Sequence, residues 1–116
     1  MTINIHASGM ELTPAIRQYV EEKFGMLEKY ASNILMIDVD LGMDTHHHQK
    51  GDIFFCSAKI DIPNDMLTVE KTEEDLYKAI DKVKDHLQES LIERKERARD
   101  LRRKGGEDSN VEEPIV

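Results

Sequence analysis

The sequence predicts an α+β fold in which two helices pack on one face of a four-stranded mixed sheet. Two stretches repeat apolar residues at helical spacing, with one apolar stripe each, and four shorter stretches alternate apolar with polar residues. Their order along the chain is β-α-β-β-β-α. Such one-sided elements bury their apolar surfaces most simply when both helices lie on the same side of the sheet.

The first strand and the first helix are each predicted by a local pattern. Ile3 and Ile5 alternate with polar neighbours, as in a short strand with one buried face. Thr13 before Pro14 predicts a helix start, because the Thr hydroxyl can accept an unpaired amide and proline at the first position loses no hydrogen bond. The helix is expected to run from residue 14 to about residue 31. Its apolar stripe consists of Ile16, Val20, Phe24, Leu27 and Ala31.

Three further strands follow in the sequence. Residues 34–43 and residues 54–62 alternate as half-buried strands do, with a polar turn between them at residues 44–52. Pro63-Asn64-Asp65 predicts a second turn, and residues 67–69 predict a short last strand. The first two strands, joined across a helix, should be parallel, and the remaining pairs should be antiparallel.

A second, longer helix is expected to begin near Thr72. Thr72 and Asp75 have the spacing of a capping box, and Glu73 and Glu74 would lie where the helix dipole favours negative charge. An apolar stripe lasts four turns, thins after its last leucine and ends before Gly105-Gly106, a usual stop signal. The stripe consists of Leu76, Ile80, Val83, Leu87 and Leu91.

Charge is strongly segregated along the chain. Residues 1–93 hold nine Lys and Arg against eighteen Asp and Glu, residues 94–104 hold seven against two, and residues 105–116 hold four acids and no base. The total of −8 alone argues against a nucleic-acid partner, since phosphate binding depends on Lys and Arg. The segregation instead indicates one domain over residues 1–104, which ends in a basic stalk at Arg94–Lys104, and an acidic flexible tail after it.

Several function classes lack their sequence signatures. Without a glycine-rich phosphate loop, metalloprotease pair or nucleophile elbow, no enzyme, cofactor or small-molecule substrate is expected. Asp38 and Asp40 are expected on the open sheet face as solubilising charge, with an active site as the lesser alternative. No apolar run has the length of a membrane span and no secretion signal is visible, which indicates a cytoplasmic protein. The single cysteine, Cys56, is expected to be a buried thiol rather than a nucleophile.

Short runs in both predicted helices resemble one known family. They are Thr13-Pro14-Ala15-Ile16-Arg17-Gln18, Lys23-Phe24, Leu27-Glu28-Lys29-Tyr30 and Glu74-Asp75-Leu76-Tyr77-Lys78-Ala79-Ile80-Asp81. The last run is similar to the helix-opening Asp-Met-Tyr-x-Ala-Ile signature of the ribosome hibernation-promoting factor and ribosome-associated inhibitor A family. The resemblance extends over residues 1–100, strong in the helices and loose from Leu35 to Thr72.

The resemblance implies a domain like the double-stranded RNA-binding fold that lodges in the decoding channel of the small ribosomal subunit. There it would occupy the space of messenger and transfer RNA and inhibit translation in stationary phase or under stress. Long-type members carry an extra C-terminal module that pairs two ribosomes. With 116 residues, the chain is expected to be of the short type, monomeric off the ribosome and unable to pair ribosomes by itself.

The resemblance also implies that basic residues on both helices contact the ribosomal RNA backbone, where phosphate contacts position a protein without reading base sequence. The stalk cations point all round a helix and could follow a phosphate backbone, or they could form an ordinary solvated helix end. On the first helix, the alternative is that the cations cover apolar edges with their stems. The expected RNA-binding residues are Arg17, Lys23, Lys29, Lys78, Lys82, Lys84, Arg94, Lys95, Arg97, Arg99, Arg102 and Arg103.

Two other groups of residues leave alternatives open. His46-His47-His48 could bind a transition metal, but adjacent turn residues rarely converge on one ion, so a loop that grazes RNA is preferred and no metal site is expected. Tyr19, Tyr30 and Tyr77 could stack on bases, although Tyr77 lies beside the stripe at Leu76 and is expected in the core or at its rim.

Two functions from different classes follow. The first is an RNA-binding inhibitor of translation that works by steric occlusion. The second is a protein-interaction module that uses the acidic sheet face and tail to hold a basic partner off the ribosome. The helix signatures favour the first function, and the negative charge of residues 1–93 favours the second.

Overall fold

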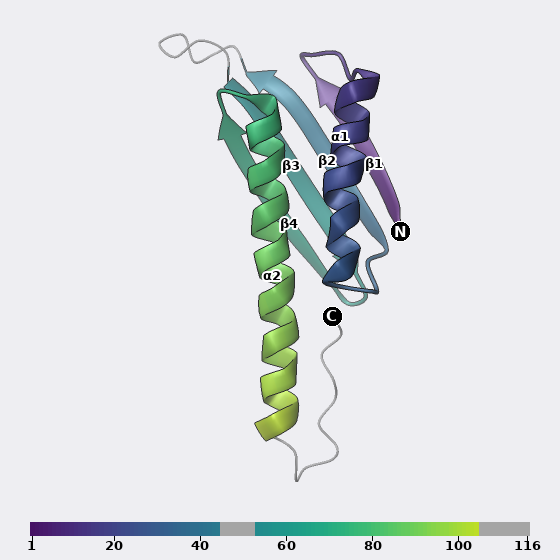
Figure 1. The fold of residues 1–116 in the computed structure, drawn as a ribbon, viewed down its shortest axis with the longest axis vertical. Coiled ribbons are helices and arrows are strands. Elements are labelled where there is room, and N and C mark those ends of the chain that lie inside the picture. The colour runs from purple at the N-terminus through teal and green to yellow at the C-terminus, as the bar shows by residue number, and fades with distance from the viewer. Residues whose placement is uncertain (45–52, 105–116) are drawn as a thin grey trace.

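The structure is a computed structural model that describes residues 1–44 and 53–104, with side chains through Met43 and from Ile53 to Asp100. The elements follow one another in the predicted order β-α-β-β-β-α (Figure 1). They are β1 (Thr2–Ser8), α1 (Pro14–Gly25), a 3₁₀ helix η1 (Met26–Lys29), β2 (Met36–Asp44), β3 (Ile53–Ile62), β4 (Asp65–Glu73) and α2 (Leu76–Lys104).

The four strands form one mixed sheet in the order β1-β2-β3-β4. As predicted, β1 is parallel to β2, and the other two pairs are antiparallel. The register aligns Ile5 with Val39, Val39 with Ala58 and Ala58 with Val69, so one row of apolar side chains crosses all four strands. Because side chains alternate between the two faces of a strand, this register gathers the apolar residues on a single face.

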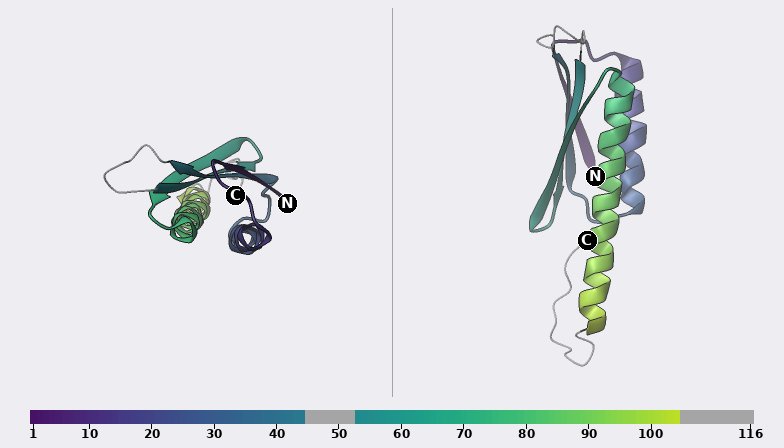
Figure 2. Two further views of the ribbon diagram at one scale, coloured as in Figure 1. Left: turned by 90° about the horizontal axis from the view of Figure 1, so that it is seen from above. Right: turned by 90° about the vertical axis from the view of Figure 1, so that its left-hand side faces the viewer.

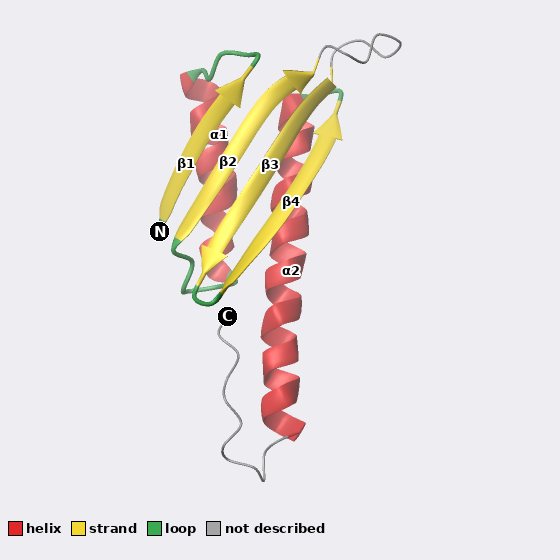
Figure 3. Cartoon of the chain, turned by 180° about the vertical axis from the view of Figure 1, so that it is seen from behind, coloured by secondary structure: helices red, strands yellow, loops and turns green. Residues whose placement is uncertain are grey.

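Both helices lie on that apolar face, side by side and running in the same direction (Figures 1 and 2). Helix α2 packs against β3 and β4, while α1 packs beside it over the β1 side of the sheet. The stripes predicted for the helices are buried, with Val20, Phe24, Ile80 and Leu87 all 0% exposed. The opposite face of the sheet is open (Figure 3). The predicted α+β architecture is therefore confirmed.

Helix α1 starts where the sequence predicts and changes form earlier than expected. The Thr13 hydroxyl accepts a hydrogen bond from the amide of Ile16 at 3.2 Å, and Pro14 occupies the first helical position. The α-helix ends at Gly25 and a 3₁₀ turn continues to Lys29, although one helix to about residue 31 was expected. Glycine has a low helix propensity, and 3₁₀ turns are common at helix ends. Leu27 is nevertheless fully buried, as its place in the stripe predicts.

The predicted start of the second helix is wrong. Thr72 and Glu73 belong to β4, where they pair with Phe55 and Phe54 of β3, so the last strand is also longer than expected. Strand pairing satisfies their backbone groups and outweighs the local capping pattern. Asp75 caps α2 instead: its Oδ1 accepts the amide of Tyr77 at 2.8 Å, and its carbonyl accepts the amide of Ala79 at 3.1 Å.

Candidate nucleic-acid interface

Helix α2 extends beyond the sheet, as the right-hand view of Figure 2 shows. It contains 29 residues against ten in the longest strand, so it is about 43 Å long where that strand spans about 33 Å. The fully buried stripe ends at Leu91, although Ala98 further along is only 2% exposed. Between them, Arg94 forms an ion pair with Asp65 at the β3–β4 turn. Arg94 thus binds the base of the stalk to the body.

Asp65 is well placed to hold that ion pair. The amide of Met66 donates a 2.7 Å hydrogen bond to its carboxylate. This bond, and then the Arg94 guanidinium, hold the pKa of the Asp65 carboxyl below its usual value. The carboxylate is therefore ionised at neutral pH, when the pair with Arg94 can form.

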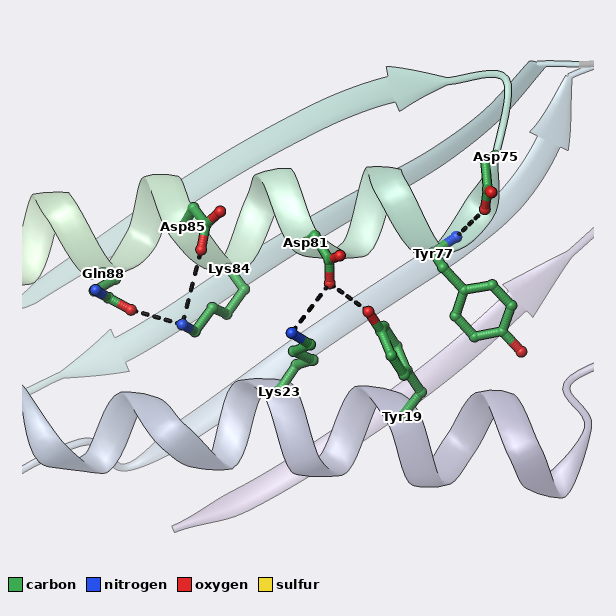
Figure 4. A network of polar contacts seen from close by, with 8 residues as sticks. All are labelled: Tyr19, Lys23, Asp75, Tyr77, Asp81, Lys84, Asp85 and Gln88. Carbon is green, nitrogen blue, oxygen red and sulfur yellow. Dashed lines mark hydrogen bonds and ion pairs between the residues drawn. The ribbon is translucent and has the colours of Figure 1, made fainter.

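A cluster of polar side chains lies between the two helices (Figure 4). Tyr19 and Lys23 of α1 point toward Asp81 of α2, and Lys84 lies one turn further along α2 on the same side. The Tyr19 hydroxyl donates a 2.6 Å hydrogen bond to Asp81. The Lys23 ammonium lies 3.5 Å from the same carboxylate oxygen and 5.5 Å from the centre of the Tyr19 ring. Together with Tyr77, we call these residues the inter-helix cluster.

The electrostatics of the cluster keep Tyr19 protonated. Its hydrogen bond to Asp81, followed by burial and the charge of Asp81, raises the pKa of Tyr19 to about 12. The hydroxyl is thus a permanent donor at physiological pH. Asp81 accepts a hydrogen bond from Tyr19 and forms an ion pair with Lys23, so it orients one aromatic and one cationic side chain of α1 at once.

Lys84 continues the cationic side of the cluster along α2. Its side chain is 13% exposed, and its ammonium donates a 2.6 Å hydrogen bond to Gln88 and lies 3.7 Å from Asp85. Lys95 lies eleven positions after Lys84, and Arg99 lies eighteen positions after Asp81. At 3.6 residues per turn these separations are close to three and to five full turns. Lys95 and Arg99 therefore extend the α1-facing flank of α2 into the stalk.

Acidic residues occupy a different side of α2. Asp85, Glu89, Glu93 and Glu96 are all exposed and follow one another at spacings of four, four and three. Residues at these spacings share one face of a helix. From residue 84 onward these four acids thus lie on a different side of α2 from Lys84, Lys95 and Arg99. The three cations form a basic flank toward α1, whereas Lys78 and Lys82 share the acidic outer face.

The remaining expected RNA-binding residues whose side chains the structure describes lie off this flank. Arg17 lies on the side of α1 away from α2, Lys29 is exposed in η1, and Lys78 is exposed in the first turn of α2. Lys82 forms an ion pair with Glu73 of β4. Arg97 lies on the other side of the stalk from Lys95 and Arg99 by helix geometry. Arg102 and Arg103 belong to α2, but their side chains lie outside the described part.

Ion pairing divides the ten expected cations whose side chains the structure describes into two groups. Lys23, Lys82, Lys84 and Arg94 each contact a carboxylate of the body. The others form no ion pair with any residue that the structure describes, so they are available to an external phosphate. These are Arg17, Lys29, Lys78, Lys95, Arg97 and Arg99.

Other candidates from the sequence have a clear outcome. Cys56 is fully buried, and burial raises the pKa of its thiol to about 12, which confirms an inert structural cysteine. Asp38 lies on the open sheet face opposite Lys59, as expected.

Within residues 1–44 and 53–104, no group of His, Cys, Asp and Glu could hold a metal ion, and no helix is long and apolar enough to cross a membrane. His46-His47-His48 lies outside the described residues.

Sequence reasoning missed the contacts that organise the surface. Tyr77 is 39% exposed and belongs to the rim, with its ring 4.7 Å from that of Tyr19 at an interplanar angle of 88°. The bond from Tyr19 to Asp81 spans 62 positions of sequence, and no local pattern points to it. The helical spacing of Lys84, Lys95 and Arg99 was visible in the sequence and could have revealed the basic flank.

The fold and this surface define a small α+β domain with a cationic flank on its helix side. The chain belongs to the family described as Sigma 54 modulation protein / S30EA ribosomal protein, whose model matches residues 3–99. The family resemblance inferred from the helix runs is therefore confirmed.

The curated relatives of the chain include three bacterial proteins. The chain is 32% identical over 91 residues to the ribosome-associated factor Y of Haemophilus influenzae, covering 78% of this chain and 79% of that protein. It is 29% identical over 97 residues to the ribosome hibernation promoting factor of Azotobacter vinelandii, covering 84% and 85%. It is 28% identical over 95 residues to the ribosome hibernation promotion factor of Bacillus subtilis, covering 82% of this chain but 49% of that protein.

Solved structures that share the fold include two bacterial proteins. The N-terminal domain of Thermus thermophilus Protein Y superimposes with a TM-score of 0.71 at 31% identity, covering 80% of this chain and 98% of that one. A ribosomal subunit interface protein from Coxiella burnetii superimposes with a TM-score of 0.72, covering 83% and 99%. At 20% identity the second match shows likeness of fold alone.

Proposed function

We propose that this chain is a ribosome hibernation factor that binds the small ribosomal subunit and inhibits translation without catalysis. Membership of the S30EA family supports the proposal, as do relatives named as hibernation factors. The observation that carries it is the shared flank of Lys84, Lys95 and Arg99, which gives an acidic protein one surface suited to phosphate. Ribosome binding would place the protein in the cytoplasm.

The proposed mechanism is steric occlusion of the decoding channel. The basic flank and the inter-helix cluster would lie along the ribosomal RNA backbone, where phosphate contacts fix position without reading sequence. The acidic outer face of α2, at Asp85 and Glu89, would then point away from that backbone. A protein seated in this way occupies the path of messenger RNA and the sites of transfer RNA, so it needs no active site.

Salt dependence tests the phosphate contacts. If four to six cations neutralise phosphates, the logarithm of the binding constant should fall with the logarithm of salt concentration with a slope of about −3 to −5. The experiment is a titration of purified small subunits with the chain at several salt concentrations, read by sedimentation through sucrose. A slope near zero, or no binding at any salt concentration, contradicts the proposal.

Inhibition must be shown separately from binding. We expect the chain to reduce protein synthesis in a purified translation system, and pre-bound messenger and initiator transfer RNA to protect the subunits because they fill the same channel. If the chain inhibits protein synthesis equally with and without pre-bound messenger and transfer RNA, steric occlusion is wrong.

The open sheet face favours a second candidate function. Its described side chains include four acids and one base, so it could bind a basic protein. They are Asp38, Asp40, Asp61, Glu70 and Lys59. If the chain is a module that holds such a partner off the ribosome, it should remain at the top of a sucrose gradient of stationary-phase lysate. Comigration with ribosomal particles supports hibernation instead.

A further inference from the structure

Tyr77 presents an aromatic ring at the rim of the inter-helix cluster. The residue is 39% exposed, whereas its neighbour Leu76 is 6% exposed and Ile80, one turn on, is fully buried. Leu76 and Ile80 therefore supply the core contacts of this turn of α2, and Tyr77 is not part of the core. Figure 4 shows the ring beside Tyr19, with its hydroxyl pointing away from the other residues of the cluster.

One contact orients the ring of Tyr77, and a second fixes its backbone. Its ring makes an edge-to-face contact with Tyr19, at 4.7 Å between centres and an angle of 88°. Tyr19 is itself held by its hydrogen bond to Asp81 and by the ammonium of Lys23 near its ring. At the backbone, the Tyr77 amide is bound by the capping carboxylate of Asp75. A ring that is already oriented loses little conformational entropy when a ligand stacks on it.

We propose that Tyr77 is a stacking platform for an unpaired base of ribosomal RNA, braced by Tyr19 on a surface that also carries Lys78 and Lys23. Lys78 is exposed and directly follows Tyr77, while Lys23 lies 5.5 Å from the centre of the Tyr19 ring. An exposed ring on a surface that also carries cations suits single-stranded RNA, in which the phosphates can contact the cations and a base can stack on the ring. The inference rests on the proposed function. It specifies base stacking as the interaction at the Tyr77 end of the proposed RNA-binding surface.

The test compares the affinity of four proteins for purified small subunits at several salt concentrations: the wild type, Tyr77→Phe, Tyr77→Leu and Lys78→Gln. Tyr77→Phe keeps the ring, Tyr77→Leu keeps apolar bulk without a π face, and Lys78→Gln removes one charge. Stacking predicts that Tyr77→Phe binds like the wild type and that Tyr77→Leu binds at least about 5-fold more weakly with an unchanged salt slope. Lys78→Gln should instead make the slope shallower by about 0.7 to 0.9.

Thermal unfolding by circular dichroism, and a crosslinking measurement, complete the test. The unfolding curve of each variant shows whether it is folded at the binding temperature. Tyr77→p-azidophenylalanine keeps a ring at the position, and illumination of its complex should attach it to a nucleotide of ribosomal RNA. That variant keeps the proposal testable even if Tyr77→Leu fails to fold.

The outcomes separate this inference from the function on which it rests. If Tyr77→Leu binds as tightly as the wild type, the stacking platform is wrong and the proposed function still stands. If Tyr77→Phe binds as weakly as Tyr77→Leu, the platform is wrong, because the hydroxyl and not the ring would then make the contact. A crosslink to a ribosomal protein also overturns the platform, because a protein would then be the partner. Failure of the wild type to bind overturns the proposed function, and the platform with it.

Discussion

The hydroxyl of Tyr19 donates a 2.6 Å hydrogen bond to the carboxylate of Asp81, and this bond links α1 directly to α2. Each helix also packs on the sheet by its own apolar stripe, so the bond is not needed to hold either helix in place. Its effect is to set how α1 presents Lys23 beside α2, since the Lys23 ammonium lies 3.5 Å from the same Asp81 oxygen. Tyr19 and Lys23 therefore share Asp81 as their partner on α2.

Removal of the Tyr19 hydroxyl should change the alkaline titration of the protein. The pKa of Tyr19 is raised from 10.0 to about 12, so one of the three tyrosines should ionise late in an absorbance titration at alkaline pH. Tyr19→Phe should abolish that late step and lower the free energy of unfolding at neutral pH by about 1 kcal/mol. Three equivalent tyrosines in the wild type would contradict the structure.

The same shift gives folding stability a pH dependence. Because the folded-state pKa of Tyr19 lies above that of the unfolded chain, the contribution is complete below about pH 10 and is lost as the pH rises toward 12. Unfolding in urea across this range should show a steeper loss of stability in the wild type than in Tyr19→Phe. Tyr30→Phe removes a hydroxyl at another site and serves as the control.

The basic flank should contribute more to subunit binding than other cations of equal charge. Lys95→Gln with Arg99→Gln removes two cations from the α1-facing side, and Arg17→Gln with Arg97→Gln removes two from other sides. We expect the first pair to make the salt slope shallower by about 1.4 to 1.8 and the second to leave it nearly unchanged. Both pairs should unfold at nearly the wild-type temperature, since exposed charges contribute little to stability. Equal effects of the two pairs would mean that the stalk binds by its overall charge.

The ion pair of Arg94 with Asp65 should stabilise the protein in a pH-dependent manner. The folded-state pKa of Asp65 is lowered, so its contribution is present above the usual carboxyl pKa and is lost as the pH falls through the lowered value. In urea unfolding, wild type and Asp65→Asn should differ at neutral pH and converge in acid. Asp85→Asn, which removes a largely exposed carboxylate, is the matched control. A difference that persists unchanged in acid would exclude the ionised pair as its cause.

Cys56 should resist modification in the folded protein. Its side chain is fully buried, and desolvation raises the pKa of the thiol to about 12, so almost no thiolate exists near pH 8. Iodoacetamide should therefore label the native chain far more slowly than the chain unfolded in urea at the same pH. Rapid native labelling would show that β3 opens locally or that the thiol is accessible.

Local sequence patterns predicted the elements where local physics governs them. Thr13-Pro14 marked the start of α1 correctly, because a capping hydroxyl and a proline act within one turn. The same reasoning failed at Thr72, because pairing of β4 with β3 offered its backbone a better set of partners than a helix cap. The residues next to Thr72 in the sequence do not indicate which of the two, strand pairing or helix capping, is more stable.

By itself, the sequence determined the order of the elements, the mixed sheet with both helices on one face, and the burial of Cys56, because the period of apolar residues settles which side of each element must leave water. Only the tertiary structure decided which charges share a surface. Lys23 and Lys84 both lie between the two helices because α1 and α2 run side by side. Tyr77 is held at the rim because its ring contacts Tyr19, which is bound to Asp81. Such contacts join residues far apart in the chain, and their geometry depends on the packing of whole helices on the sheet.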